Sequence, residues 1–375
     1  MNRRAIWGIP AKTGVTLIVL LLALGAGARA ADAPVGSTHL TVPGDTASRG
    51  EASNRLNVAV WYPAAAGTAM QPMAVGPPQT PYFLEGEAAN DVAIAGTPAR
   101  FPFIVVSHGT GGTTMDLDWL CAGLAARGYI VASVDHPGNN ALEPATVAGT
   151  TLWWMRAGDL SHVIDGLLAT ARFGSRIDST RIGAMGFSLG GYSVLAIAGA
   201  RANPHLLDAY CARKPETPAC SGVATPDIPD VGAQAHALAA RDPQYRAAAA
   251  ANADSHRDPR VKAVFSIAPA LGPAILPESL ESIAIPVAFV AGMRDPILPV
   301  ADNVVPDALA IPNAELTLFA APVGHYTFLP DCTPAGREKL AQICGDSGPE
   351  RIAVHQATIE LARSFFLRAL GAAGR

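Results

Sequence analysis

The sequence has no run of basic residues beyond its N-terminal segment, and its formal net charge is −4. Proteins that bind nucleic acid concentrate positive charge to neutralise phosphates, so this composition argues against a nucleic-acid partner. The sequence also lacks C-x-x-C pairs and clustered histidines, which argues against a metal site. Internal repeats and heptads are absent as well, so solenoids and coiled coils are excluded. We therefore expect a small-molecule partner and no metal or other cofactor.

The sequence lacks an obvious membrane span, because the apolar run over residues 15–24 is shorter than the about 20 residues that a bilayer requires. Basic residues precede this run, and small residues ending in "ARA" at positions 28–30 follow it. This order predicts a secretory signal peptide over residues 1–30 and a mature chain that starts near Ala31. We therefore expect an exported protein, periplasmic or secreted, with no stable membrane insertion once the leader is removed.

Cysteine is also scarce, with five residues in the chain. Cys211 and Cys220 lie close together in one proline-containing stretch, and Cys332 and Cys344 lie close together in another. An oxidising compartment favours disulfides, so we predict these two local pairs. Cys121 is left over on a predicted helix, where we expect a buried free thiol.

Short runs rich in Val, Ile and Phe alternate with helical patterns along the chain, which is typical of a mainly parallel sheet with helices on both faces. The predicted strands are Leu56–Tyr62, Phe101–Ser107, Tyr129–Asp135, Arg181–Phe187, Val261–Ala268, Val287–Gly292 and Glu315–Ala320. The predicted helices are Asp116–Arg127, Met155–Arg172, Leu189–Ala200, Ala301–Leu309 and Arg351–Leu370. The sequence thus predicts one α/β domain over residues 31–375.

Two segments interrupt the alternation. Residues 64–100 are rich in Pro, Gly and Ala and are expected to form a long surface excursion. Residues 201–258 form an Ala-rich insertion with one of the predicted disulfides. We interpret this insertion as a cap or lid over a site at the nearby strand ends. The alternative is a surface insertion with no part in the site.

The stretch "GFSLGG", residues 186–191, joins a predicted strand to a predicted helix. It contains the pattern G-x-S-x-G, in which glycines allow a sharp turn and the serine hydroxyl is exposed at the carboxyl edge of the sheet. Ser188 is therefore the candidate nucleophile. A serine hydroxyl reacts poorly at neutral pH, so this assignment requires a base, an acid and two oxyanion donors elsewhere in the chain.

The stretch "HGTGG", residues 108–112, directly follows another predicted strand. A glycine-rich turn in this place directs backbone N–H groups into a site, and an oxyanion site needs two such groups. We assign these donors to the main chain of Thr110 and Leu189. For His108 we expect an orienting or packing role.

The candidate base and acid follow later strands. His325 comes after the last predicted strand, and we prefer it to His136, which precedes Ser188 in the chain. Asp295 follows the preceding strand, where it would orient the imidazole of His325. We prefer Asp295 to Asp302, which is expected on the next helix.

With these residues in place, the chain resembles the α/β-hydrolase superfamily, and within it exported bacterial proteins similar to dienelactone hydrolases or to platelet-activating-factor acetylhydrolase. The stretches that carry the resemblance are "LNVAVWYPA" (56–64), "FPFIVVSHGTGG" (101–112), "LAARGYIVASVDHPGN" (124–139), "RIGAMGFSLGGYSVLA" (181–196), "DPRVKAVFSIAPA" (258–270), "AGMRDPILP" (291–299) and "GHYTFL" (324–329). The resemblance implies an α/β-hydrolase fold with a cap insertion after the nucleophile helix.

The chain departs from both groups in one place each. Dienelactone hydrolases proper use a cysteine nucleophile, whereas this chain has Ser188. The acetylhydrolases carry their acid just after the strand that follows the nucleophile, where this chain has Pro269 and Ala270. These departures favour plain carboxylic ester hydrolysis over dienelactone or phospholipid specificity.

The sequence therefore predicts a serine hydrolase that cleaves carboxylic esters through an acyl-enzyme intermediate. An amidase or peptidase, or a lipase or phospholipid acyl hydrolase, would use the same triad. A binding protein that has lost the activity is a further alternative. Trp153 and Trp154 are candidates for the acyl pocket, although such residues are also common in cores. Arg156 and Asp159 are expected only to brace their helix.

Overall fold

The computed structural model describes residues 16–20, 33–45, 49, 54–218, 220, 228–320 and 322–371. The strands are β1 Thr16–Leu20, β2 Val35–Pro43, β3 Arg55–Pro63, β4 Gln71–Val75, β5 Phe83–Asn90, β6 Phe101–Ser107, β7 Ile130–Val134, β8 Ile177–Phe187, β9 Val261–Ile267, β10 Val287–Gly292 and β11 Glu315–Phe319. The α-helices are α1 Asp118–Ala125, α2 Val147–Thr151, α3 Met155–Ala169, α4 Leu189–Ala198, α5 Pro204–Arg213, α6 Val231–Arg241, α7 Pro243–Ala250, α8 Pro277–Glu281, α9 Val304–Ala310, α10 Pro334–Lys339, α11 Ala341–Cys344 and α12 Pro349–Leu370.

The strands form one sheet in the order β1-β11-β10-β9-β8-β6-β7-β3-β2-β5-β4. Pairing is parallel from β1 through to β7, and β3 joins both β7 and β2 in antiparallel fashion. The carboxyl ends of the parallel strands therefore share one edge of the sheet. In open α/β sheets, ligands bind at this edge.

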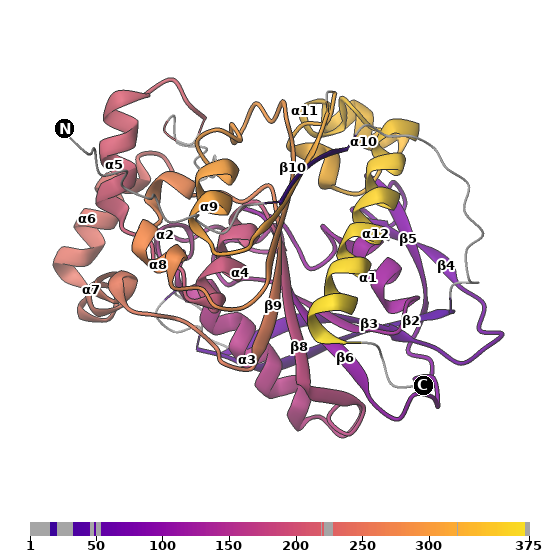
Figure 1. Ribbon diagram of the computed structural model, residues 1–375. Coiled ribbons are helices and arrows are strands. Elements are labelled where there is room, and N and C mark those ends of the chain that lie inside the picture. The colour runs from indigo at the N-terminus through magenta and orange to yellow at the C-terminus, as the bar shows by residue number, and fades with distance from the viewer. Residues whose placement is uncertain are drawn as a thin grey trace, which may run out of the picture.

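Helices cover both faces of the sheet (Figure 1). On one face α1 packs against α12, and on the other α3 packs against α4. The central strands β6, β7 and β10 are consequently buried along their whole length. A strand buried on both faces is a continuous apolar run, which is why these strands are easy to recognise in the sequence.

All seven predicted strands and all five predicted helices are present, with small shifts at their ends. The prediction for residues 64–100 needs a correction. These residues were expected to form a surface excursion, but they contain β4 and β5, and β5 pairs with β2 and extends the sheet. Most side chains of these two strands are half-buried or exposed, so they lack the apolar pattern that identifies a strand. Strand β2, which lies between β3 and β5, was likewise not predicted.

Part of the predicted leader has a place in the sheet. Residues 16–20 form β1, which pairs with β11 at the outer edge. Residues 1–15 and 21–30 lie outside the described residues, and the signal peptide stays a prediction. Within the described part of the chain, no helix is long and apolar enough to cross a membrane.

The insertion after α4 contains α5, α6 and α7, while residues 219 and 221–227 lie outside the described part. It is attached to the carboxyl edge of the sheet at two points. Tyr210 in α5 and Lys214 directly after it bind Asp302, at 2.9 and 2.6 Å. In α7, the hydroxyl of Tyr245 lies 2.8 Å from that of Thr151 in α2. These contacts place the insertion beside the site, and a lid function stays a prediction.

The structure contains both predicted disulfides, Cys211–Cys220 in the insertion and Cys332–Cys344 near the C-terminus. The remaining cysteine, Cys121, is free and fully buried in α1. Burial raises the pKa of the Cys121 thiol well above its usual value. Two disulfides fit a protein of an oxidising compartment.

These assignments predict a specific thiol count. The folded chain should not react with Ellman's reagent, because the Cys121 thiol is buried and protonated. Unfolding in guanidinium without reductant should expose one thiol per chain, and reduction should expose all five. The variant Cys121→Ser should give no thiol before reduction. Two or more thiols in the unfolded, unreduced wild-type chain would contradict the pairing.

Candidate active site

Ser188 occupies the turn between β8 and α4, with φ +57° and ψ −120°. A residue other than glycine rarely adopts a positive φ, at a cost on the order of 1–3 kcal/mol. Two backbone hydrogen bonds hold this conformation. The Ser188 N–H donates to Ile267 O at 2.9 Å, and Ala270 N–H donates to Ser188 O at 3.0 Å. The end of β9 and the residues that follow it therefore hold the backbone of Ser188 on both sides, a role the sequence did not reveal.

The glycines around Ser188 are required by close approaches of the backbone. A Cβ on Gly186 would lie 2.2 Å from Gly190 O, and a Cβ on Gly190 would lie 2.0 Å from Ser107 O. Both neighbours are backbone atoms that cannot rotate away. The G-x-S-x-G pattern thus permits α4 to begin directly against the end of β6.

His325 joins Ser188 to Asp295. Its Nε2 lies 3.0 Å from Ser188 Oγ, and its Nδ1 lies 2.7 Å from Asp295 Oδ2. All three side chains are largely buried at the carboxyl edge of the sheet. The imidazole packs against Phe187, with 4.8 Å between ring centroids. The structure therefore brings together the three residues that the sequence analysis selected.

The surroundings of Asp295 fix its orientation. Its second oxygen, Oδ1, accepts the N–H groups of Ile297 and Leu298, at 2.9 and 2.8 Å. With Asp295 ionised, the Nδ1–H of His325 donates to it, and Nε2 is left to accept the hydroxyl proton of Ser188. The rival acid Asp302 is instead paired with Lys214.

The rival base His136 belongs to a separate buried row. Its Nε2 lies 2.7 Å from Ser107 Oγ, and its Nδ1 lies 2.8 Å from Asp159 Oδ2. Ser107 and His136 have no exposed surface. Burial and the positive charge of Arg156 lower the pKa of His136 to about 3. This row repeats the Ser–His–Asp arrangement where no substrate has access.

The loop from His108 to Gly112 runs beside Ser188. A Cβ on Gly109 would lie 3.3 Å from Ser188 Cβ, so the loop backbone is adjacent to the nucleophile. In the described part of the chain, neither the N–H of Thr110 nor that of Leu189 has a hydrogen-bond acceptor. Both amides therefore remain available as the predicted oxyanion donors. His108 bonds within its own loop, as an orienting role requires, and its Nδ1 lies 2.6 Å from Gly109 O.

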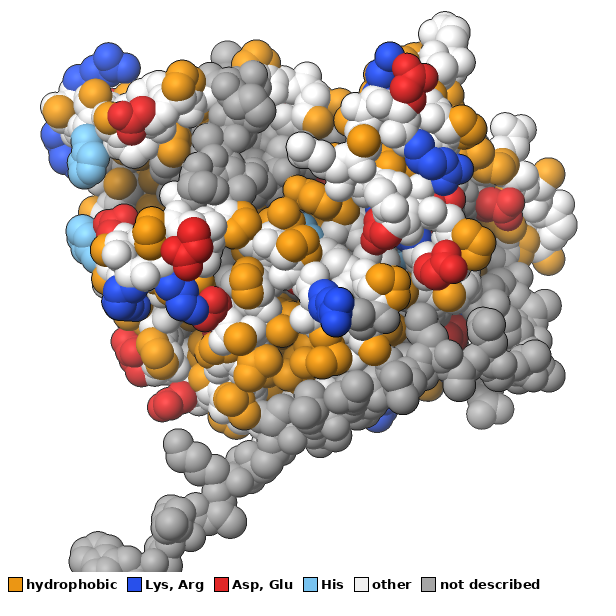
Figure 2. Space-filling view, turned by 90° about the horizontal axis from the view of Figure 1, so that it is seen from above, with side chains coloured by type: hydrophobic (Ala, Val, Ile, Leu, Met, Phe, Trp, Pro, Cys, Tyr) orange, Lys and Arg blue, Asp and Glu red, His pale blue; other side chains and the backbone are white. Residues whose placement is uncertain are grey.

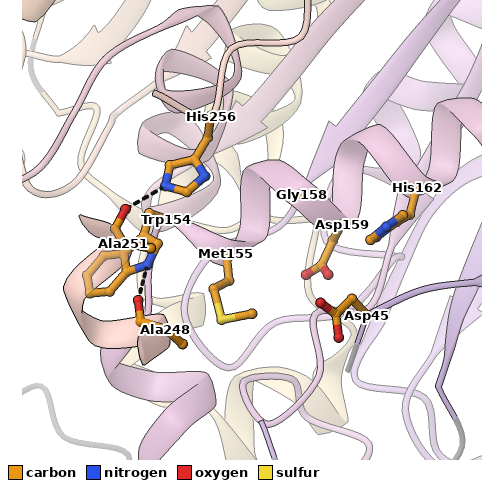
Figure 3. Close-up of a pocket in the computed structure, with 9 residues that line it drawn as sticks. All are labelled: Asp45, Trp154, Met155, Gly158, Asp159, His162, Ala248, Ala251 and His256. Atoms are coloured by element: carbon orange, nitrogen blue, oxygen red, sulfur yellow. Dashed lines mark hydrogen bonds between the residues drawn. The ribbon is translucent and has the colours of Figure 1, made fainter. Parts of the chain in front are cut away.

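The two tryptophans predicted for the acyl pocket contact other groups. Trp154 is buried among residues of the insertion, and its Nε1 donates to Ala248 O at 3.0 Å. It lines a cavity of about 180 Å³ between α3 and the insertion (Figure 3), and Ser188, Asp295 and His325 are not part of this lining. Trp153 is half-buried and donates to Thr150 O. Trp154 thus helps to anchor the insertion.

Arg156 and Asp159 do more than brace their helix. Arg156 donates to His108 O at 2.7 Å and to Gly109 O at 3.2 Å, so it holds the loop beside Ser188. The sequence contained a signal for the burial of these two residues, although not for the contact with the loop. Both residues fall on the face of α3 that also carries Leu160 and Val163, so their charged groups are buried with the apolar side chains.

The surface above the strand ends carries both hydrophobic and charged side chains. Figure 2 looks down on this surface and shows hydrophobic side chains gathered over its middle, with most charged side chains toward the margins.

Among the described residues, no group of three or more His, Cys, Asp or Glu is placed to hold a metal ion.

Comparisons with known proteins agree with this architecture. A ferulic acid esterase from Streptomyces cinnamoneus matches with a TM-score of 0.50 and 21% identity, over 90% of each chain. The chain has the α/β-hydrolase fold. The predicted fold class is therefore confirmed. No curated protein matches the chain in sequence.

A family model also matches part of the sequence. It describes platelet-activating factor acetylhydrolase, isoform II, and it covers residues 85–150. The match includes the loop from His108 to Gly112, but it ends before Ser188. The description of the sequence model names an acetylhydrolase, and the solved structure is that of an esterase.

Because the backbone approaches closely at Gly190, adding a single methyl group there should strongly reduce both stability and activity. In Gly190→Ala, the new Cβ would overlap Ser107 O, so α4 would have to move away from β6. We expect a loss of stability of several kcal/mol, as for other overpacked buried sites, together with loss of activity. Thermal unfolding and ester hydrolysis measure both effects.

Gly158→Ala on α3 is the matched control. Nothing lies within 4 Å of a Cβ at Gly158, and alanine is favoured over glycine in a helix by about 1 kcal/mol. This variant should be as stable as the wild type or more so. If Gly190→Ala behaved like Gly158→Ala, the close approach would not constrain the site.

Proposed function

We propose that the chain is a serine esterase that cleaves carboxylic esters through an acyl-enzyme. One observation carries this proposal: the two ring nitrogens of His325 connect the hydroxyl of Ser188, at 3.0 Å, to the carboxylate of Asp295, at 2.7 Å. The positive φ of Ser188 and the unpaired amides beside it support the same reading. The names of the two matching proteins support an ester as the substrate.

The proposed reaction has two halves. Ser188 Oγ attacks the ester carbonyl while His325 Nε2 takes its proton, and Asp295 stabilises the resulting imidazolium. The N–H groups of Thr110 and Leu189 hold the oxyanion. When the tetrahedral intermediate collapses, His325 gives the proton to the leaving alcohol. Water then attacks the acyl-enzyme by the same route and releases the acid.

The first test is hydrolysis of p-nitrophenyl esters from acetate to palmitate, with methyl ferulate included because a structural neighbour is a ferulic acid esterase. Ser188→Ala should lose several orders of magnitude in kcat. Asp295→Asn should lose about 10⁴-fold, because the asparagine favours the wrong imidazole tautomer. Asp302→Asn is the matched control and should keep most of the activity, since it weakens only the partly exposed contacts with Lys214 and Tyr210, neither of which belongs to the triad.

The possible outcomes separate the alternatives. Near-native activity of Ser188→Ala would contradict the proposal. A rate that rises only above the micelle threshold of a long-chain ester would favour a lipase. Cleavage of amides in preference to esters would favour an amidase. If a fluorophosphonate fails to label Ser188, a binding protein becomes the better reading.

A further inference from the structure

Behind the loop of residues 108–112 lies a buried group of charged and titratable side chains that the proposed triad does not use. It consists of Arg49, His108, His136, Arg156 and Asp159, each at most 2% exposed. Arg49 binds both oxygens of Asp159, at 2.5 and 2.6 Å. This pair leaves Arg156 as the second buried cation of the group.

Arg156 directs its guanidinium at the backbone. It donates to His108 O at 2.7 Å, to Gly109 O at 3.2 Å and to Asn139 O at 3.3 Å. None of these acceptors is a carboxylate. Burying a cation without a bound counter-ion is costly, and here the three carbonyls stabilise it together with the nearby charges of Asp159 and Asp116. In return, the guanidinium fixes the positions of two consecutive peptide groups in the loop.

The peptide between Gly109 and Thr110 has a defined orientation for this reason. In a planar trans peptide, C=O and N–H point in opposite directions. Because Gly109 O faces Arg156, the N–H of Thr110 faces away from it. A Cβ on Gly109 would lie 3.3 Å from Ser188 Cβ, so this peptide is next to the nucleophile.

We propose that Arg156 is a positioning residue of the oxyanion site, which holds the Gly109–Thr110 peptide so that the Thr110 N–H is directed at the oxyanion formed on Ser188. The inference rests on the proposed function. The inference adds a role for a side chain that contacts neither the substrate nor the triad.

A second donor to the same carbonyl supports this role. His108 Nε2 accepts the N–H of His136 at 3.1 Å, so the ring proton is on Nδ1 and donates to Gly109 O. Burial and the charge of Arg156 lower the pKa of His108 well below its usual value, which keeps this ring neutral. Gly109 O is thus held by two side-chain donors, in addition to the N–H of Gly112 at 3.4 Å.

The row of Ser107, His136 and Asp159 also helps to hold the loop of residues 108–112. It fixes the ring of His136, whose residue supplies the backbone N–H that orients His108. The other end of the loop is held by Asn139, whose Oδ1 accepts the N–H of Gly111 at 2.8 Å. Among these contacts, those of Arg156 act on the peptide next to Ser188 and can be removed by a single substitution.

The test compares Arg156→Gln and Arg156→Lys with the wild type. Loss of one oxyanion donor lowers kcat by about 10²–10³ in other hydrolases, so Arg156→Gln should lose about 100-fold and Arg156→Lys less. KM should change little, because the ground-state ester does not need the donor. Titration with a fluorophosphonate counts the folded active sites, and kcat is calculated per active site.

The affinity for a trifluoromethyl ketone inhibitor separates a positioning role from a purely structural one, because loss of a purely structural contact would leave this affinity unchanged. The hemiketal oxygen of the bound inhibitor occupies the oxyanion position, so its affinity should fall by the same factor as kcat/KM in each variant. The matched control is Arg176→Gln. Arg176 also donates to two backbone carbonyls, Ala95 O and Pro98 O, but it precedes β8 at the opposite edge of the sheet. This variant should retain wild-type kcat and inhibitor affinity.

The results distinguish the two proposals. Wild-type activity in Ser188→Ala would overturn the proposed function and the inference with it. If Ser188→Ala is inactive while Arg156→Gln keeps wild-type kcat and inhibitor affinity, the inference alone is wrong.

A crystal structure of the wild-type protein carrying a phosphonate on Ser188 decides the matter even if both Arg156 variants fail to fold. We expect the phosphoryl oxygen to accept the N–H of Thr110, with Gly109 O still bound to Arg156. An oxygen directed away from Thr110 would overturn the inference.

Discussion

The site depends on the close approach of the first turn of α4 to the end of β6. At Gly190 there is no room for a Cβ beside the carbonyl of Ser107. This approach forces the chain to reverse within one residue and leaves Ser188 at a positive φ with its hydroxyl at the sheet edge. It also leaves the N–H of Leu189 without an acceptor in the described part of the chain. One steric constraint thus positions the candidate nucleophile and one of its oxyanion donors.

Around this point the protein uses two buried rows of serine, histidine and carboxylate for different purposes. The row of Ser188 lies at the carboxyl edge, and Ser188 keeps 9% of its surface exposed. The row that contains His136 lies deeper and has no exposed surface at Ser107 or His136. The two rows have similar geometry, and they differ in exposure and environment. The deeper row, with Arg156, instead maintains the loop that the first one needs.

Much of this arrangement is encoded locally. Strands such as β6 and β10 are continuous apolar runs because they are buried on both faces, and their bounds were predicted to the residue. Once these strands were assigned, the G-x-S-x-G pattern, the positions after strand ends and the chain order of serine, acid and histidine selected Ser188, Asp295 and His325. Strands β4 and β5 were missed because edge strands with exposed side chains lack that pattern.

The sequence by itself determined the fold class, the disulfide pairs and the three residues joined through His325, because short-range patterns of glycine, apolar residues and cysteine specify each of them. Only the tertiary structure decided the roles of Arg156 and Trp154. Both lie within "TLWWMR", residues 151–156. Nothing in this stretch shows that Arg156 binds the carbonyls of the loop at 108–112 or that Trp154 anchors the insertion. Their partners are distant in sequence, and a side chain's role in a buried network depends on which backbone groups the fold brings to it.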